Sequence, residues 1–324
     1  MLPTRLTLAI ETGVVHLPES GRIAVAGARA GDDLSMLPKD RTVVITRFYP
    51  DYHAFETAGY DVATAFEEEF ALAVISLPRA KLDAQQMVAT AAMATTGQLI
   101  IDGQKTNGVA SMLKALKSRG TVGEVISKAH GKLFVVTGGD FQDWLHKSSK
   151  VDGFVTAPGV FSADGIDPGS AALVKVLPQR LKGRVIDLGA GWGYLSDAVL
   201  KREGVTAVEL IEADAAALGA ARNNITDKRA TFTWADATTI KTEPADHIVT
   251  NPPFHTGRVA DHDLGRAFIR NAAKLLKPKG TLWLVANRHL PYESTLEESF
   301  HTVQLLDQSA SYKVYSATRP KTPR

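Results

Sequence analysis

The Asn-Pro-Pro-Phe segment at 251–254 has residue types and a spacing that suit chemistry on a planar nitrogen. Proline fixes φ and has no N–H to donate, so Pro252 and Pro253 end the preceding apolar segment in a stiff turn. The side-chain oxygen of Asn251 and the carbonyl of Pro252 would accept hydrogen bonds from an exocyclic amine. Those bonds would draw the amine hydrogens out of conjugation with the ring. Phe254 would stack on the flat face of that ring.

An amide in this position orients and polarises N–H bonds rather than removing a proton first. This chemistry suits N6 of adenine, N4 of cytosine, N2 of guanine or the amide of a protein glutamine, and it suits a phosphate or carboxylate poorly. His255 follows the motif, where it would contact the substrate or cap the loop. The alternative for the motif taken alone is a stiff loop with no chemistry.

A second motif, Asp-Leu-Gly-Ala-Gly-Trp-Gly, occupies 187–193, between a predicted strand and a predicted helix. Gly189, Gly191 and Gly193 permit a tight turn and let a ligand approach the backbone closely. Their spacing is G-x-G-x-G, which differs from the dinucleotide pattern G-x-G-x-x-G, and no G-K-[ST] of a P-loop follows. The alternative is a tight strand-to-helix turn without a ligand.

Acidic residues follow the neighbouring predicted strands. Glu212 ends the second strand and is placed to bind ribose hydroxyls. Asp236 and Ala237 follow the third strand. Together with the glycines, this set resembles the S-adenosylmethionine pocket of class I methyltransferases. By that resemblance Asp187 lies near the methionine moiety, Asp236 bonds the adenine amino group, and the Ala237 backbone lies beside it.

These residues are positioned by apolar strands that alternate with amphipathic helices. Such alternation predicts a mostly parallel sheet with helices on both faces. Ligands of such sheets bind outside the carboxyl ends of the strands, so Asn251 is expected to face the cofactor methyl group. Strands are predicted at 183–191, 205–214, 230–236, 245–253, 281–287 and 312–319, and helices at 194–202, 215–225 and 264–280, the last ended by Pro278 and Gly280.

The N-terminal half repeats this rhythm less cleanly. Segment 21–31 parallels 183–193, and 71–81 parallels 245–255, in the same order along the chain. We therefore predict a whole-domain duplication, with two tandem Rossmann-like α/β domains at 1–150 and 151–324. The loop-rich stretch 154–173 would act as a lid or clamp. Phe161 within it would close over the cofactor or a base, with core packing as the alternative.

Composition sets further limits. The chain of 324 residues suits two domains and contains no cysteine, which excludes disulfides, a thiolate nucleophile and Cys-ligated zinc. No metal site is predicted. No apolar run is long enough to span a membrane and no signal peptide is evident, so we expect a cytoplasmic, soluble protein. We also expect it to be a monomer. The net charge is +2, but segment 101–150 carries an excess of Lys and Arg. That segment is either a solvated surface or a patch that contacts phosphates.

Several segments taken together resemble the RsmC-like ribosomal RNA guanine-N2 methyltransferases. They are 157–173, 185–196, 248–257, 285–292 and 312–317, with His255, Gly257 and the Pro-Gly-Val-Phe-Ser of 158–162 as the most specific parts. The resemblance implies S-adenosylmethionine as cofactor, N2 of a guanine in 16S rRNA as target, and ribosomal RNA or the small subunit as partner. It also implies that the first domain is a degenerate copy without cofactor, which supports the second domain and contacts RNA.

Three alternatives stay open at this point. A large-subunit rRNA guanine-N2 methyltransferase would share much of the same pattern. A protein glutamine N-methyltransferase would also use the Asn251 motif, although a peptide substrate gives no reason for a basic segment. A non-catalytic ribosome assembly factor would keep the pocket without turnover, and the intact Asn251, Glu212 and Asp187 argue against it.

Overall fold

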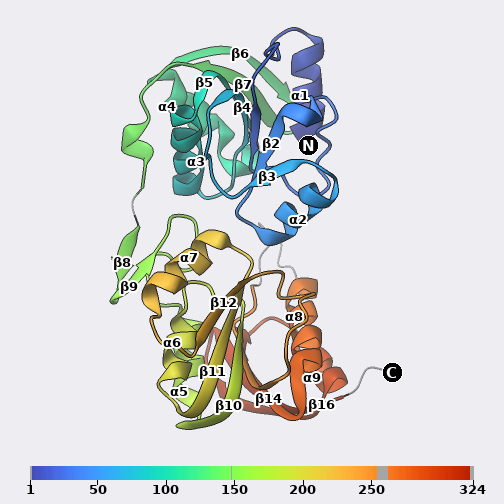
Figure 1. Cartoon of the computed structure of the whole chain (residues 1–324), viewed down its shortest axis with the longest axis vertical. Coiled ribbons are helices and arrows are strands. Elements are labelled where there is room, and N and C mark those ends of the chain that lie inside the picture. The colour runs from blue at the N-terminus through green and yellow to red at the C-terminus, as the bar shows by residue number, and fades with distance from the viewer. Residues whose placement is uncertain (1, 147, 254–261, 322–324) are drawn as a thin grey trace. The chain divides into compact units, whose positions relative to one another are not determined.

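The computed structural model describes residues 2–146, 148–253 and 262–321, and the chain divides into two compact units, Met1–Lys147 and Ser148–Arg324. Elements of both units are labelled in Figure 1. The first unit contains α1 (Leu2–Glu11), β1 (Ile23–Ala26), η1 (Lys39–Arg41), β2 (Thr42–Ile45), α2 (Tyr49–Thr57), β3 (Asp61–Ala63), β4 (Phe70–Ser76), α3 (Lys81–Met93), β5 (Thr95–Gln104), η2 (Lys105–Asn107), α4 (Val109–Lys117), β6 (Thr121–Lys128), β7 (Gly131–Thr137) and η3 (Gln142–Trp144).

The second unit opens with a short hairpin and continues as an alternation of helices and strands. It contains β8 (Ser149–Val151), β9 (Phe154–Thr156), α5 (Pro168–Val176), β10 (Arg180–Leu188), α6 (Tyr194–Leu200), β11 (Glu203–Glu212), α7 (Ala215–Asn224), β12 (Ala230–Trp234), β13 (Ala245–Thr250), α8 (His262–Leu275), β14 (Leu276–Asn287), α9 (Glu293–Ser299), β15 (Phe300–Gln308) and β16 (Tyr312–Pro320).

The two units share one sheet topology. Within the residues described, each unit has a seven-stranded sheet, ordered β3-β2-β1-β4-β5-β7-β6 in the first and β12-β11-β10-β13-β14-β16-β15 in the second. In both sheets five strands are parallel and the last two pair antiparallel with their neighbours. The predicted fold, two tandem Rossmann-like α/β domains, is confirmed.

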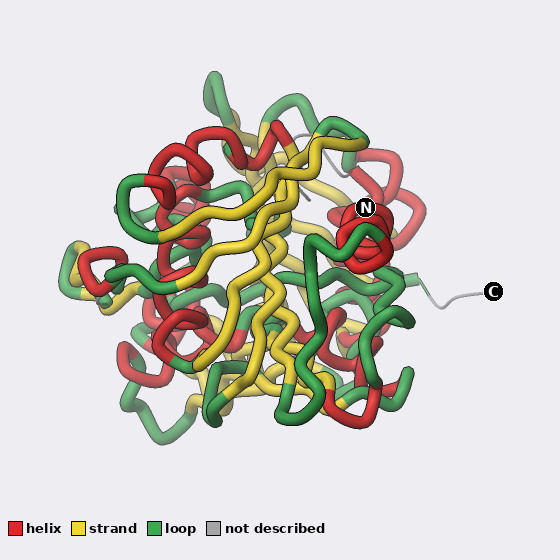
Figure 2. The backbone as a smooth tube through the Cα atoms, turned by 90° about the horizontal axis from the view of Figure 1, so that it is seen from above, coloured by secondary structure: helices red, strands yellow, loops and turns green. Residues whose placement is uncertain are grey.

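Buried side chains form a separate cluster on each face of each sheet. Figure 2 shows helices in red beside the yellow strands. Because side chains alternate along a strand, neighbouring residues belong to different cores. Ile23 of β1 packs in the cluster that contains Leu6 of α1. Ala24, the next residue, packs in the cluster that contains Val88 of α3. Two-sided burial explains why these strands read as continuous apolar runs in the sequence.

The structure differs from the predicted elements at one helix end. Helix α8 ends at Leu275, and Pro278 and Gly280 lie in β14 rather than at the helix terminus. The pairing of β13 with β14 is irregular between Ala245 and His247. The first stretch of β14 therefore tolerates Pro278, which has no backbone N–H to donate to a neighbouring strand. The prediction of a helix that continues to 280 was wrong.

Five elements of the second unit were not predicted: β8, β9, α5, α9 and β15. The polar run before 154 forms β8 of a hairpin, and the loop-rich stretch contains the start of α5 at Pro168. Strand β15 pairs with β16 at the edge of the sheet, and most of its side chains are exposed, so it lacks the apolar signal of a buried strand. No helix among the described residues is long and apolar enough to cross a membrane.

A buried ion pair holds α1 onto the first sheet. Arg5 is fully buried and donates two hydrogen bonds to the carboxylate of Asp102 in β5, at 2.5 and 2.8 Å. A third Arg5 bond, of 3.0 Å, reaches the carbonyl of Lys128 at the end of β6. A buried charge is tolerated only when its partner and its remaining donors are satisfied, so this helix depends on the pair.

We expect Arg5→Ala to lower the free energy of unfolding of the first unit by about 3–5 kcal/mol, because it leaves Asp102 charged and buried without its partner. Arg22→Ala is the matched control, since Arg22 pairs with Asp61 at the surface, and it should change stability by less than about 1 kcal/mol. Urea denaturation combined with hydrogen exchange at the amides of β5 measures both. Equal losses for the two variants would contradict the role assigned to Arg5.

Candidate active site

The two sequence motifs meet where the second sheet reverses its strand order. Strands β10 and β13 are parallel neighbours there, β10 leading into Gly189 and β13 leading into Asn251. The buried hydroxyl of Thr250 donates a 2.6 Å hydrogen bond to the carbonyl of Leu188, which ties the two strand ends together. Since ligands of open α/β sheets bind at this reversal point, the glycine loop and Asn251 share one site.

The three glycines have left-handed backbones with different surroundings. Their φ values are +80° at Gly189, +55° at Gly191 and +95° at Gly193. A Cβ at Gly193 would come within 2.8 Å of Ile225, and a Cβ at Gly189 within 3.0 Å of Phe268. A Cβ at Gly191 would meet nothing within 4 Å. Gly189 and Gly193 therefore allow close packing, whereas Gly191 borders open space that a ligand can fill.

Glu212 holds the glycine loop from the end of β11. Its Oε2 accepts a 2.8 Å hydrogen bond from the backbone N–H of Gly191, and its Oε1 accepts one of the same length from Asp214. Burial raises the pKa of Glu212, and these backbone bonds oppose the shift. Each carboxylate oxygen can accept more than one bond, so both can still receive ribose hydroxyls.

Asp187 is fully buried at the end of β10. Its Oδ2 accepts a 2.7 Å hydrogen bond from the hydroxyl of Ser196, while its Oδ1 has no partner among the described residues. Burial raises the pKa of Asp187 to about 7, and the nearby charge of Glu212 acts in the same direction. A buried carboxyl oxygen without a partner is unusual and is explained when a donor from a ligand reaches it.

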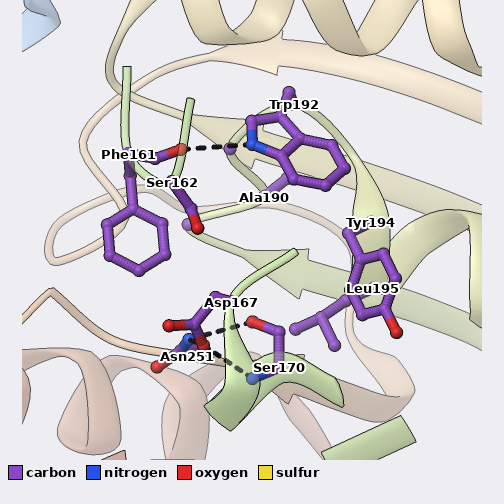
Figure 3. Close-up of a pocket in the computed structure, with 11 residues that line it drawn as sticks. Phe161, Ser162, Asp167, Ser170, Ala190, Trp192, Tyr194, Leu195 and Asn251 are labelled. Atoms are coloured by element: carbon purple, nitrogen blue, oxygen red, sulfur yellow. Dashed lines mark hydrogen bonds between the residues drawn. The ribbon is translucent and has the colours of Figure 1, made fainter. Parts of the chain in front are cut away.

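A pocket with about 380 Å³ of empty space lies over the glycine loop (Figure 3). It brings together four of the predicted site residues: Phe161, Gly189, Gly191 and Asn251. Asp187 and Glu212 lie outside its lining, and Glu212 is connected to it through its bond to Gly191.

Asn251 presents one end of its amide to two acceptors. Its Nδ2 donates hydrogen bonds of 2.8 Å to Oδ2 of Asp167 and of 2.9 Å to the hydroxyl oxygen of Ser170. Figure 3 shows the amide nitrogen turned toward these two residues. Within the described residues, Oδ1 of Asn251 accepts no hydrogen bond. The amide is therefore oriented with its nitrogen toward the start of α5 and its oxygen away from these two acceptors.

Phe161 lies at the rim of the pocket, on the segment that was predicted to be a lid. Its side chain is 53% exposed, so it is not part of the core. Trp192 is buried and donates a 3.1 Å hydrogen bond from its indole N–H to the Phe161 carbonyl. Ser162 next to it has φ of +53°, an uncommon backbone for a residue with a side chain. The backbone of Phe161 is thus anchored while its ring stays exposed at the rim.

The remaining predicted site residues lie away from this pocket or outside the described part of the chain. Asp236 accepts a 2.8 Å hydrogen bond from the backbone of Thr238, and the buried Ala237 accepts one of 2.8 Å from Asn271 through its carbonyl. Pro252 is buried and Pro253 is exposed. Phe254, His255 and Gly257 lie outside the described residues, and Gly193, Asp236 and Ala237 do not line the pocket.

Comparison with known proteins places these features in one family. The methyltransferase small domain family matches residues 152–316. Ribosomal RNA small subunit methyltransferase C of Hahella chejuensis is 31% identical over 320 residues, 93% of this chain and 92% of the relative. The same enzyme of Alteromonas mediterranea is 31% identical over 78% of this chain and 75% of the relative. The chain belongs to the ribosomal RNA small subunit methyltransferase C family.

A solved structure of this family extends the comparison to the whole fold. The T. thermophilus 16S rRNA N2 G1207 methyltransferase RsmC, in complex with AdoMet and guanosine, is 25% identical, with a TM-score of 0.79 over 94% of this chain and 90% of that one. The predicted family and enzyme class are confirmed. The residues of this chain also fit AdoMet, since Gly191 borders open space and Asp187 has a carboxyl oxygen that meets no hydrogen-bond partner among the described residues and could accept from a cationic group.

The first unit of this family member keeps the topology and changes the residues at the strand ends. Gly21-Arg22 stands directly before β1, and the matching Gly183-Arg184 lies within β10. Ile23 pairs with Leu72 as Val185 pairs with His247. This register defines the equivalent positions of the two sheets. The pairs are Val25 and Asp187, Arg29 and Gly191, Thr46 and Glu212, and Ser76 and Asn251.

Sequence reasoning missed Asp167 and Ser170, the partners of Asn251. Asp167 caps α5, because its side chain accepts a 2.7 Å hydrogen bond from the Ser170 backbone, and Pro168 follows as the first helical residue. Asp followed by Pro is a recognised signal for a helix start, so α5 was predictable from it. Its proximity to Asn251 was not, because 84 positions separate Asp167 from Asn251 in the chain.

We expect the stability of the cofactor-free second unit to fall as the pH rises from about 4 to about 7. The folded state keeps a proton on Asp187, whose pKa is about 7, whereas the unfolded state releases it near 3.8. Each pKa unit corresponds to about 1.4 kcal/mol, so the loss reaches at most about 4 kcal/mol. Denaturation of wild type and Asp187→Asn across this pH range measures it. A constant difference between the two proteins would contradict the expectation.

Proposed function

We propose that this protein transfers a methyl group from S-adenosylmethionine to the exocyclic N2 amine of a guanine in 16S ribosomal RNA. One observation carries the proposal: both acceptors of the Asn251 amide hydrogens belong to the protein, which leaves Oδ1 of Asn251 to accept from an amine beside the glycine loop. Family membership supports the RNA target, since the relatives are named as small-subunit enzymes and the T. thermophilus protein as an N2 G1207 methyltransferase.

The residues at the strand ends would hold the cofactor by complementary groups. Glu212 would accept the ribose hydroxyls, and Oδ1 of Asp187 would accept from the amino group at the methionine end. Asp236 and the Ala237 backbone would bind the adenine, with Gly191 allowing close approach of the ligand. When bound, the cofactor supplies an electrophilic methyl group.

Asn251 and Pro252 would make the guanine amine nucleophilic. The N2 lone pair is delocalised into the guanine ring, which makes the amine a poor nucleophile. Two acceptors that hold the N–H bonds in fixed directions would turn this lone pair toward the methyl group. As the bond from N2 to the methyl carbon forms, the bond between that carbon and the cofactor sulfur would break, and N2 would gain a positive charge. N2 would then release its extra proton to solvent. Phe161 at the pocket rim, and Phe254, would stack on the flat base once it is splayed out of the RNA.

The first unit would support the catalytic one and contact the RNA backbone. Lys114 and Lys117 on α4 carry the positive charge for this contact. Arg119 contributes less, because it pairs with both carboxylate oxygens of Asp143 at 2.6 and 2.8 Å and stacks on Trp144. We also propose that the protein acts on ribosomal RNA as a monomer in the cytoplasm.

Methyl transfer from tritiated S-adenosylmethionine tests the proposal directly. The acceptors are small subunits, large subunits, naked 16S rRNA and a glutamine-containing peptide, and mass mapping of nucleosides identifies the product. We expect N2-methylguanine in 16S rRNA. Label in the large subunit or the peptide would favour those substrates instead, and tight cofactor binding without any transfer would indicate an assembly factor.

We expect Asn251→Ala to abolish methyl transfer and to leave cofactor affinity within a few-fold of wild type. The substitution removes the acceptor for the amine, whereas Glu212 and the glycine loop stay intact. Single-turnover transfer and calorimetric titration with S-adenosylmethionine measure the two effects. Loss of cofactor binding to the same extent as activity would show that Asn251 acts mainly by holding the loop.

We expect one cofactor site per chain and none in Gly191→Arg. This variant places at 191 the residue that stands at the equivalent position 29 of the first unit, where the Arg29 guanidinium lies 5.3 Å from the centre of the Phe48 ring and 3.4 Å from Asp51. An arginine at 191 would occupy the open space beside the glycine loop. Equilibrium dialysis gives the stoichiometry, and binding that persists in Gly191→Arg would reveal a site in the first unit.

A further inference from the structure

We propose that Asp167 and Ser170 are positioning residues that set which way the Asn251 amide faces, and so make its oxygen the substrate acceptor. The proposal rests on the function proposed above for Asn251. The two residues come from the start of α5, far from Asn251 in the sequence, and they converge on the single atom Nδ2 at 2.8 and 2.9 Å. Neither contacts the substrate amine in this scheme. They act through Asn251.

The carboxylate of Asp167 can distinguish the two ends of the Asn251 amide. An amide has an acceptor at one end and a donor at the other, and nothing in its shape distinguishes the two ends. An ionised carboxylate only accepts hydrogen bonds, so Oδ2 of Asp167 attracts Nδ2 of Asn251 and repels Oδ1. With the opposite orientation, two oxygens would face each other and an N–H donor would face a substrate that also donates.

Asp167 is itself held in place by the helix that it caps. Its Oδ2 accepts from the Ser170 backbone at 2.7 Å as well as from Asn251, so one oxygen serves the helix cap and the amide together. Gly169 brings this helix start close to β16, since a Cβ there would come within 2.8 Å of the Tyr312 ring. Ser170 is buried, and its hydroxyl oxygen supplies the second acceptor.

The arrangement predicts that two unfavourable substitutions compensate each other. Asn251→Asp alone places two carboxylates where one hydrogen bond of 2.8 Å now stands. In Asp167→Asn/Asn251→Asp, the new amide at 167 can donate to one oxygen of the new carboxylate at 251, which leaves its other oxygen to accept from the substrate. Donor and acceptor have changed places, and the oxygen that faces the amine is restored.

The experiment is a double-mutant cycle on methyl transfer to 16S rRNA by the full-length protein. Asp167→Asn should lower kcat at least about tenfold with little change in KM for S-adenosylmethionine, because the orienting bond involves a charged group. The double variant should be at least about tenfold more active than Asn251→Asp. Losses that simply multiply, so that the double variant is the least active of the set, would overturn the proposal.

A second measurement does not depend on catalysis. In Asn251→Asp the paired carboxyls share a raised pKa, so the unfolding temperature should fall as the pH rises from 5 to 8 more steeply than in wild type. Asp167→Asn in the same chain should remove the extra slope, and an unchanged slope would contradict the contact. If wild type is inactive on 16S rRNA while this slope behaves as expected, the proposed function fails and the positioning of Asn251 stands.

Ser170 is tested separately from the helix cap. Ser170→Ala removes the hydroxyl acceptor and keeps the backbone N–H that Asp167 caps. We therefore expect kcat to fall several-fold, while the unfolding temperature changes no more than it does in a control variant. The control is Ser316→Ala, which deletes a similarly buried hydroxyl from β16. Activity of Ser170→Ala equal to that of Ser316→Ala would exclude Ser170 from the positioning role.

Discussion

The reversal of strand order between β10 and β13 is the constraint on which the rest of the second unit depends. It opens the carboxyl edge of the sheet, and the hydrogen bond from Thr250 to the Leu188 carbonyl fixes the distance between the two strand ends. The glycine loop leaves from one strand and Asn251 from the other. The helices on both faces bury the strands and make this edge rigid, so two chain segments far apart in the sequence meet as a single site.

The two units show that the sheet and the chemistry are separable. Both keep the same strand order, and Gly27 keeps the left-handed turn after β1, where a Cβ would come within 2.2 Å of the Ser76 carbonyl. Gly27 is needed because a larger residue would clash with its neighbours, as at Gly189 in the second unit. The positions that border the ligand space differ, with Arg29 at the place of Gly191. Apolar alternation therefore preserves the fold, while the residues just past the strand ends differ between the two units.

The sequence allowed the duplication, the parallel sheets and the two motifs to be predicted, because each depends on local spacing and on strands buried on both faces. The end of α8 was misplaced because Pro278 and Gly280 also suit an irregular start of β14. Strand β15 was missed because an exposed edge strand has no apolar pattern. Asp167 was missed as a site residue because its contact with Asn251 arises only from tertiary packing, which no local pattern encodes.

The contact between Asp167 and Asn251 also determines whether a hydrogen-bond acceptor or a donor of Asn251 faces away from α5. A backbone carbonyl such as that of Pro252 has one fixed direction, set by the stiff turn. A side-chain amide can rotate by 180° and exchange the places of its oxygen and nitrogen, which are similar in size. The proline turn alone therefore does not determine whether the oxygen or the nitrogen of Asn251 would face the substrate amine. A charged acceptor at the cap of α5 removes that ambiguity. In the proposed reaction, the acceptor pair would depend on two separate elements, the proline turn for one oxygen and the α5 cap for the other. Loss of either would leave only one acceptor for two N–H bonds.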